Sequence, residues 1–216
     1  MMRSALIVWG GWDGHDPEEC AAIYRRWLHE DGFSVRVETD TAVLGDPSIS
    51  ELSLIVPIFT MSKLEREHAQ NFAKAVEGGV GVGGHHGGMS DAFRDAVDYQ
   101  FVIGGQWVAH PGNIIDYTVE VTKPDDPVMQ GIPASFPYHS EQYYMHMDPA
   151  VEVLATTTFS GEHAAWTKGV VMPVVWKHRY GAGKVFHCTL GHRAAEFENK
   201  EMATIVRRGI NWAARE

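Results

Sequence analysis

The sequence is short of cysteine and of long apolar runs. Its 216 residues include two cysteines, Cys20 in a helical pattern and Cys188 in a strand pattern. Each is expected to be a small buried hydrophobe rather than half of a disulfide. Near the start, only Ala5 to Trp9 forms an apolar run, and it is too short for a signal-peptide core or a membrane span. We therefore expect a cytoplasmic protein without a membrane partner.

Basic residues are also fewer than acidic ones. The chain has 28 acidic and 18 basic side chains, a formal charge of −10. An acidic surface repels phosphate backbones, which argues against nucleic acid as a partner. The apolar share of 44% is enough for a sizeable core, and the length suits one α/β domain over residues 1–216. The composition is compatible with a small-molecule substrate as partner and with a homo-oligomer.

Several common functional motifs are missing. Gly183-Lys184 is followed by Val185, so there is no Walker A sequence, and neither H-E-x-x-H nor Cys-x-x-Cys occurs. A G-x-G-x-x-G match over 79–84 falls inside an expected strand instead of opening a helix, which disfavours a dinucleotide site. A metal site would have to combine distant side chains.

The first hundred residues alternate strand and helix patterns. Asp16-Pro17 gives a strong helix start, with Asp at the N-cap and Pro at the first helical position. This alternation predicts a doubly wound parallel sheet. The expected strands cover 5–9, 34–38, 52–57 (ending in a proline turn) and 80–84, and the expected helices cover 17–31 and 65–77, with another opening at Ser90.

The second half of the chain has a different pattern. Residues 116–122 and 151–157 read as half-solvated strands, and the Pro/Met/Tyr-rich stretch between them, 124–147, as a site-forming loop. Residues 170–176 and 184–190 read as a hairpin whose second strand rejoins the parallel sheet, and 199–214 as a closing helix. The expected fold is thus α/β with added antiparallel strands.

Histidine is abundant, with twelve residues, and it recurs in turns that follow strands or lie in the irregular middle. Ligands of open α/β sheets bind beyond the carboxyl ends of the strands, where histidine can bind metal or move protons. A lone histidine is more often structural, but core packing does not require this recurrence. Residues 80–88 have the shape of a nucleophile elbow with histidine at its apex. The turns carry His15, His85-His86, His110 and His192.

Carboxylate and aromatic groups could complete such a site. Glu141, between polar and aromatic neighbours, could be a general base or a ligand, although an exposed loop carboxylate is the simpler interpretation. Trp107, Trp166 and Trp176 could stack on sugar rings, whereas core or loop packing is the ordinary role of tryptophan and is favoured for Trp176.

These residues, in their order along nearly the whole chain, resemble the ThuA-like (trehalose-utilisation) family. The matching pieces are His15-Asp16, His86-Gly87-Gly88, Gly104-Gly105 with His110-Pro111, Glu141 with Tyr143, 173–176, 180–185, Gly191-His192 and 209–212. The resemblance implies the flavodoxin-like fold of class I glutamine amidotransferases, a three-layer doubly wound and mostly parallel sheet with long site-forming loops. It also implies a role in the use of trehalose and related, oxidised sugars.

Two positions depart from the family pattern. Ser140 stands where the family usually has an acidic residue, and His85 where it usually has an apolar one. The family resembles an amidotransferase that has lost its nucleophilic cysteine, with histidine in its place. Hydrolysis of glutamine by a thiolate is therefore not expected.

The sequence thus suggests an enzyme acting on a sugar or keto-sugar by His/Glu acid–base or metal-assisted chemistry. A non-catalytic sugar-binding or regulatory subunit is the alternative. A serine hydrolase is disfavoured because neither Ser90 nor Ser140 lies at the elbow apex. The expected catalytic residues, also the candidate ligands of a divalent metal such as zinc, are His86, His110, Glu141 and His192. The expected substrate-binding residues are His15, Asp16, His85, Trp107, Tyr143 and Trp176.

Overall fold

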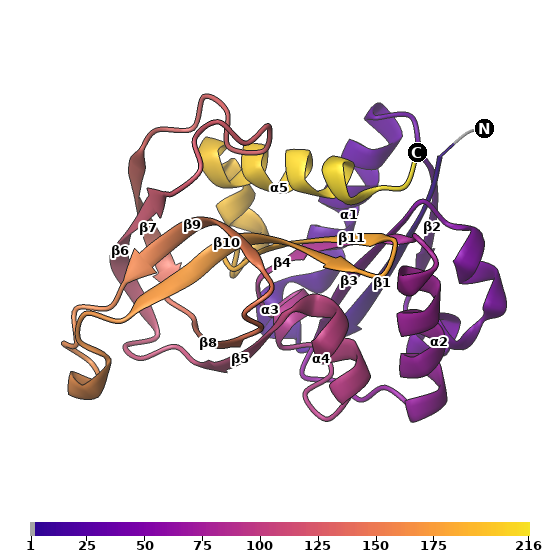
Figure 1. Cartoon of the computed structure of the whole chain (residues 1–216), viewed down its shortest axis with the longest axis horizontal. Helices are drawn as coiled ribbons and strands as arrows, with labels where there is room; N and C mark the ends of the chain where they lie inside the picture. Colours follow the sequence, from indigo (N-terminus) through magenta and orange to yellow (C-terminus); the bar gives the residue numbers. More distant parts are fainter. Residues whose placement is uncertain (1–2) are drawn as a thin grey trace.

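A nine-stranded sheet runs through the molecule in the computed structural model, which describes residues 3–216 (Figure 1). The strand order is β2-β1-β3-β4-β11-β10-β9-β6-β7. The first five strands in this order are parallel: β2 (Ser34–Glu38), β1 (Ser4–Gly11), β3 (Leu54–Thr60), β4 (Gly81–His85) and β11 (Gly183–Cys188). The other four are antiparallel: β10 (Val171–Tyr180), β9 (Glu152–Thr158), β6 (Ile114–Val121) and β7 (Ser135–Glu141).

Helices cover both faces of the parallel half, as the doubly wound pattern predicts. α1 (Pro17–Glu30) and α5 (Lys200–Ala213) lie on one side, and α2 (Arg66–Glu77) and α4 (Val97–Ile103) on the other (Figure 1). Each pair buries an apolar stripe, with Leu28 and Ile205 in one core and Phe72 and Val102 in the other. The result is the three-layer α/β fold.

Local signals mark the starts of α1 and α5. Pro17 begins α1 and Asp16 precedes it, but the Asp16 carboxylate does not cap the helix; it lies 3.3 Å from the backbone N–H of Ala194, from which it accepts a hydrogen bond. Asn199 caps α5 by accepting a bond from the N–H of Met202 at 2.9 Å. The hairpin of β10 and β11 also forms as predicted, with β11 parallel to β4.

Two cysteines behave as expected from their patterns. Cys20 and Cys188 are both buried and both free thiols. Burial raises the pKa of each thiol to about 12, so neither is poised to act as a nucleophile.

The prediction of a strand end at Pro57 is wrong. β3 continues to Thr60, because its parallel pairing with β1 runs from Leu54 to Thr60 and includes Pro57, opposite Val8. On its other side the pairing with β4 is limited to Leu54 and Ile55, so Pro57 lies beyond the β3–β4 ladder and costs that ladder no hydrogen bond.

The prediction of a helix opening at Ser90 is also wrong. The short helix α3 (His86–Ser90) ends there, and α4 starts at Val97. The carbonyls of Asp91 and Ala92 accept bonds from the N–H groups of Met61 and Ser62 at 2.8 and 2.7 Å. These tertiary bonds occupy the carbonyls that a continuing helix would use.

The stretch 124–147 contains more regular structure than predicted. It includes β7 and β8 (Tyr144–Met147), and β8 pairs with β5 (Gly105–Ala109) in a separate two-stranded sheet. Along β7, exposed Ser135 and Pro137 alternate with buried Phe136 and Tyr138. The sequence analysis missed this period-two pattern, because a proline and the polar aromatic residues beside it are more typical of a loop.

Candidate functional site

A pocket of about 340 Å³ opens where the parallel strands end. The segments that follow β1, β3, β4 and β11 meet there with the end of β7, as expected for an open α/β sheet. Its lining side chains are Trp12, His15, Thr60, Met61, Asp91, Arg94, Trp107, His110, Asn113, Ile114, Glu141, Tyr143 and His192.

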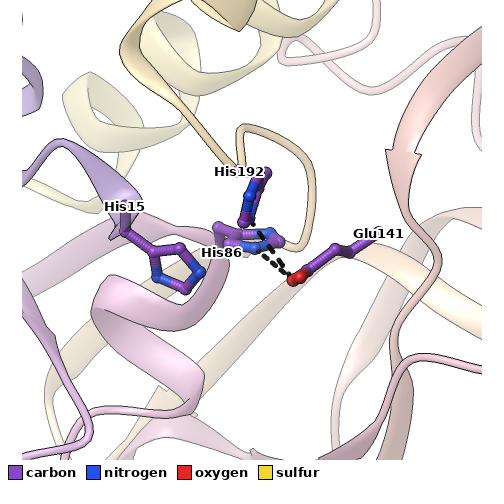
Figure 2. Close-up of side chains that lie close together, drawn as sticks. All are labelled: His15, His86, Glu141 and His192. Carbon is purple, nitrogen blue, oxygen red and sulfur yellow. Dashed lines mark hydrogen bonds and ion pairs between the residues drawn. The ribbon is translucent and has the colours of Figure 1, made fainter. Parts of the chain in front are cut away.

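Four side chains converge at this pocket: three of them line it, and the fourth, His86, is buried against the rings of His15 and His192. His15 follows β1, His86 follows β4, Glu141 ends β7 and His192 follows β11. Figure 2 shows the three imidazoles and the carboxylate turned toward one another. One potential ligand atom from each lies within 4.8 Å of the others, and all four residues are buried. We call His15, His86, Glu141 and His192 the His/Glu cluster.

His86 occupies the apex of the predicted elbow. Its φ of +47° puts a non-glycine residue in the left-handed region directly after β4. Its Nδ1 lies 2.7 Å from the carbonyl oxygen of Thr189, which can only accept, so Nδ1 carries the hydrogen and Nε2 faces Glu141. At Gly87 a Cβ would lie 2.6 Å from Cε1 of His15, so glycine lets the two rings approach.

Glu141 is the hub of the His/Glu cluster. Its Oε2 lies 3.1 Å from His86 Nε2 and 3.4 Å from His192 Nδ1, and its Oε1 lies 3.6 Å from His110 Nε2. Burial acts to raise the pKa of Glu141, but the adjacent rings of His192 and His86 outweigh it and lower the pKa below its ordinary value. Glu141 is therefore a buried carboxylate at a strand end, and not the exposed loop group of the simpler interpretation.

His15 is held as a neutral ring. Burial, and then the neighbouring His86 and His192, lower its pKa to about 2. Its Nδ1 lies 2.8 Å from Oγ1 of Thr60, which orients the imidazole from outside the cluster. A neutral, oriented imidazole is the form that ligates metals.

Some buried polar atoms of the pocket make no hydrogen bond. Within residues 3–216 these include Nδ1 of His110 and Nε1 of Trp107, and Nδ1 of His192 faces Glu141 at 3.4 Å without hydrogen-bond geometry. Buried polar atoms are rarely left unpaired without a reason, and a bound ion or ligand is one such reason.

Backbone strain is concentrated around the same pocket. Within residues 3–216, the non-glycine residues with positive φ are Asp16, Met61, His86 and Asn113, at +47° to +58°. Met61 and Asn113 line the pocket, His86 is in the cluster and Asp16 adjoins His15. Such conformations cost free energy and tend to gather at functional sites.

The structure brings most of the predicted site residues together. His110, Trp107 and Tyr143 line the pocket beside the His/Glu cluster. The rings of His86 and Tyr143 are 4.2 Å apart. Asp16 adjoins His15, but its carboxylate is directed to Ala194.

Two predicted substrate-binding residues do not reach the pocket. His85 is the last residue of β4 and points away from it, with Nδ1 2.9 Å from the Tyr24 hydroxyl and its ring packed on Phe197. Trp176 is fully buried and donates from Nε1 to the Ile103 carbonyl at 3.1 Å. Both side chains belong to the packed interior of the protein.

Other pocket residues gave little or no signal in the sequence. Asp91 and Arg94 form a two-point ion pair, at 2.5 and 2.9 Å, and the Arg94 guanidinium lies 4.7 Å from the ring centre of Trp107. Trp12 comes directly after β1, and no sequence motif marked its place. Thr60, Met61, Asn113 and Ile114 come from segments whose ends sequence patterns locate poorly.

The sequence pattern of the family described as "trehalose utilisation" (ThuA) matches residues 4–213. The chain belongs to this family. Membership implies a carbohydrate-related role in trehalose utilisation, consistent with the resemblance noted from the ordered motifs. No curated protein matches the chain.

Solved structures support the fold assigned to this ThuA-family chain. A ThuA-like protein from Bacteroides uniformis has a TM-score of 0.78 at 20% identity, over 98% of this chain and 91% of that one. A ThuA-like protein from Parabacteroides merdae has a TM-score of 0.73 at 19% identity, over 98% and 89%. A cytoplasmic protein of Salmonella typhimurium has 0.65 at 14%, over the full length of both.

A helix that spans a lipid bilayer must be long and apolar, and no helix within residues 3–216 meets both demands.

Proposed function

We propose that this ThuA-family protein is a cytoplasmic, metal-dependent enzyme acting on a sugar or keto-sugar. The observation that carries the proposal is the His/Glu cluster, in which three imidazoles and a carboxylate meet at a pocket. The family supplies the carbohydrate context. The Salmonella neighbour, described as a cytoplasmic protein, supports the location.

The donor set suits a first-row divalent cation such as zinc. Zinc binds imidazole nitrogen and carboxylate oxygen at about 2.0–2.2 Å, so two atoms on one zinc lie at most about 4.4 Å apart. The ligand atoms here lie within 4.8 Å of one another, which a few tenths of an ångström of side-chain movement would close. His86 already has the arrangement of a metal ligand, with Nδ1–H on a backbone carbonyl and Nε2 facing inward.

The residues divide naturally into ligands and a proton carrier. A cation in the cluster would polarise a sugar carbonyl or activate water. His110 lies outside the cluster, lines the pocket and is more exposed than the four ligands, with 27% of its side chain accessible. Its Nε2 lies 3.6 Å from Glu141 Oε1, a separation that supports a role for His110 in moving a proton between the substrate and the cluster.

The proposal is tested by elemental analysis of protein purified without chelator. The protein is then titrated with zinc and manganese and incubated with keto-disaccharides. We expect about one cation per chain and conversion of a keto-sugar, both lost in His86→Ala. His139→Ala is the matched control, because His139 is exposed and pairs with Asp116 outside the pocket. Full activity in His86→Ala would refute catalysis at the His/Glu cluster, and sugar affinity without any product by mass spectrometry would favour the non-catalytic alternative.

A further inference from the structure

Trp12 is a pocket residue that neither the sequence motifs nor the proposed chemistry uses. It lines the pocket and leaves 45% of its surface accessible. Trp107 lines the same pocket, but the Arg94 guanidinium covers its ring and its Nε1 is buried. Trp166 is 85% accessible and does not line the pocket. Trp12 therefore offers the pocket an accessible indole.

Three contacts fix the position of Trp12, one through its backbone and two through its ring. Its backbone N–H donates to the Thr60 carbonyl at 3.1 Å. The indole meets His15 edge to face, with ring centres 4.7 Å apart at 70°, and its centre is 6.4 Å from that of His192. The ring thus adjoins two members of the His/Glu cluster.

Gly14 provides the third support. A Cβ at Gly14 would lie 2.4 Å from Cζ2 and 2.6 Å from Cη2 of Trp12, closer than atoms can approach. Gly14 has no positive φ, so its backbone does not itself demand glycine. Glycine at this position therefore serves the indole, which rests directly against the backbone.

An accessible indole beside polar groups is suited to a sugar ring. A pyranose with equatorial hydroxyls presents faces of C–H bonds, which pack on an aromatic surface while the hydroxyls stay hydrogen-bonded at the edge. The pocket offers such edge partners in Asp91, Arg94 and Asn113. We infer that Trp12, backed by Gly14, is the stacking platform that holds a gluco-configured pyranose ring next to the His/Glu cluster. This inference rests on the proposed function, because it concerns the substrate of the same site.

Saturation-transfer NMR and calorimetry with glucose, trehalose and the open-chain polyol sorbitol test the platform. Zinc binding is measured separately on every variant. We expect both ring sugars, but not sorbitol, to bind, with saturation reaching the ring C–H protons. Trp12→Ala should weaken sugar binding about tenfold, as the loss of one buried aromatic contact predicts, and Trp12→Phe less. Gly14→Ala should weaken it similarly although the indole remains, and Trp166→Ala should have no effect.

The outcomes separate this inference from the proposed function. Equal sugar affinity in Trp12→Ala and the wild type would overturn the platform and leave the metal site untouched. Loss of zinc together with sugar in Trp12→Ala would also overturn it, because the indole would then merely shield His15. If the wild type bound sugar but took up no zinc, the metal-dependent function would be refuted. The sugar affinities of Trp12→Ala and the wild type would still show whether Trp12 is the stacking platform.

Discussion

Nε2 of His86 lies 3.1 Å from Oε2 of Glu141, on the side of the ring opposite to the Thr189 carbonyl. Thr189 follows β11, and His192 stands three residues further along the same segment. The backbone that orients His86 therefore also carries another member of the cluster. A shift of this segment would move two of the four side chains together.

Removing the support of His15 should weaken metal binding. Thr60→Val keeps the side-chain shape but deletes the hydroxyl that lies 2.8 Å from His15 Nδ1. Loss of such an outer partner typically costs about 10- to 100-fold in metal affinity, and zinc calorimetry would measure it. Thr122→Val is the control, since the Thr122 hydroxyl bonds the Val153 carbonyl outside the pocket. Equal zinc affinity in wild type and Thr60→Val would argue that His15 is not a ligand.

Chelation should lower thermal stability. A ligand that binds only the folded state at 100 times its Kd stabilises it by about 2.7 kcal/mol. For a chain of this size that corresponds to roughly 5–10 °C in Tm. Calorimetric scans with zinc and with chelator would show the shift. In Glu141→Gln the two scans should coincide, because the central carboxylate of the cluster is gone; a full shift in that variant would place the metal elsewhere.

Acidification should destabilise the fold through His85. Burial, and then the neighbouring His86, lower the pKa of His85 from 6.5 to about 3. The folded ring stays neutral while the unfolded chain takes up a proton below about pH 6.5, so stability falls as the pH drops from 6.5 toward 3. The slope from this group approaches about 1.4 kcal/mol per pH unit. Urea unfolding in chelator from pH 4 to 8 should show a shallower slope in His85→Gln than in the wild type; identical slopes would contradict the argument.

Ser140 and Glu196 should be energetically coupled. The Ser140 hydroxyl donates to Glu196 Oε1 at 3.0 Å, and Tyr138 donates to the other oxygen at 2.7 Å. Ser140→Asp, which restores the acidic type that the family resemblance leads one to expect, would set two carboxylates together and cost about 1–3 kcal/mol of stability. Adding Glu196→Gln should recover much of that loss, since an amide can donate to the new carboxylate. Strictly additive effects in the double-mutant cycle would show that the residues do not interact.

Much of the fold was accessible from sequence because its signals are local. The apolar run at residues 5–9, Pro17 at the first position of α1 and Asn199 at the start of the predicted closing helix act over a few residues and require no distant partner. The expected Asp16 cap did not form, because its carboxylate bonds the distant Ala194. Strand β7 was not predicted, because Pro137 and its polar neighbours resemble a loop. Its pairing partner β6 also lies some twenty residues away along the chain.

The candidate site could be predicted from the sequence only in part, and the reason is geometric. Histidines at the carboxyl ends of parallel strands are brought together by the sheet itself, so the convergence of His15, His86 and His192 follows from the topology. The division between His85 and His86 depends on which way each side chain turns at the end of β4, and only the structure shows it. Arg94 reaches the pocket because α3 stops at Ser90, which depends on hydrogen bonds from the distant Met61 and Ser62.

The spacing of the cluster along the chain has a consequence for folding. His15, His86, Glu141 and His192 are each separated by more than fifty residues, and they come from both the parallel and the antiparallel halves of the sheet. A cation held by all four would close three long loops, restricting the unfolded chain much as a set of cross-links does. Neither half of the chain contains the complete donor set. The rate of zinc uptake during refolding would therefore report when the two halves of the sheet first come together.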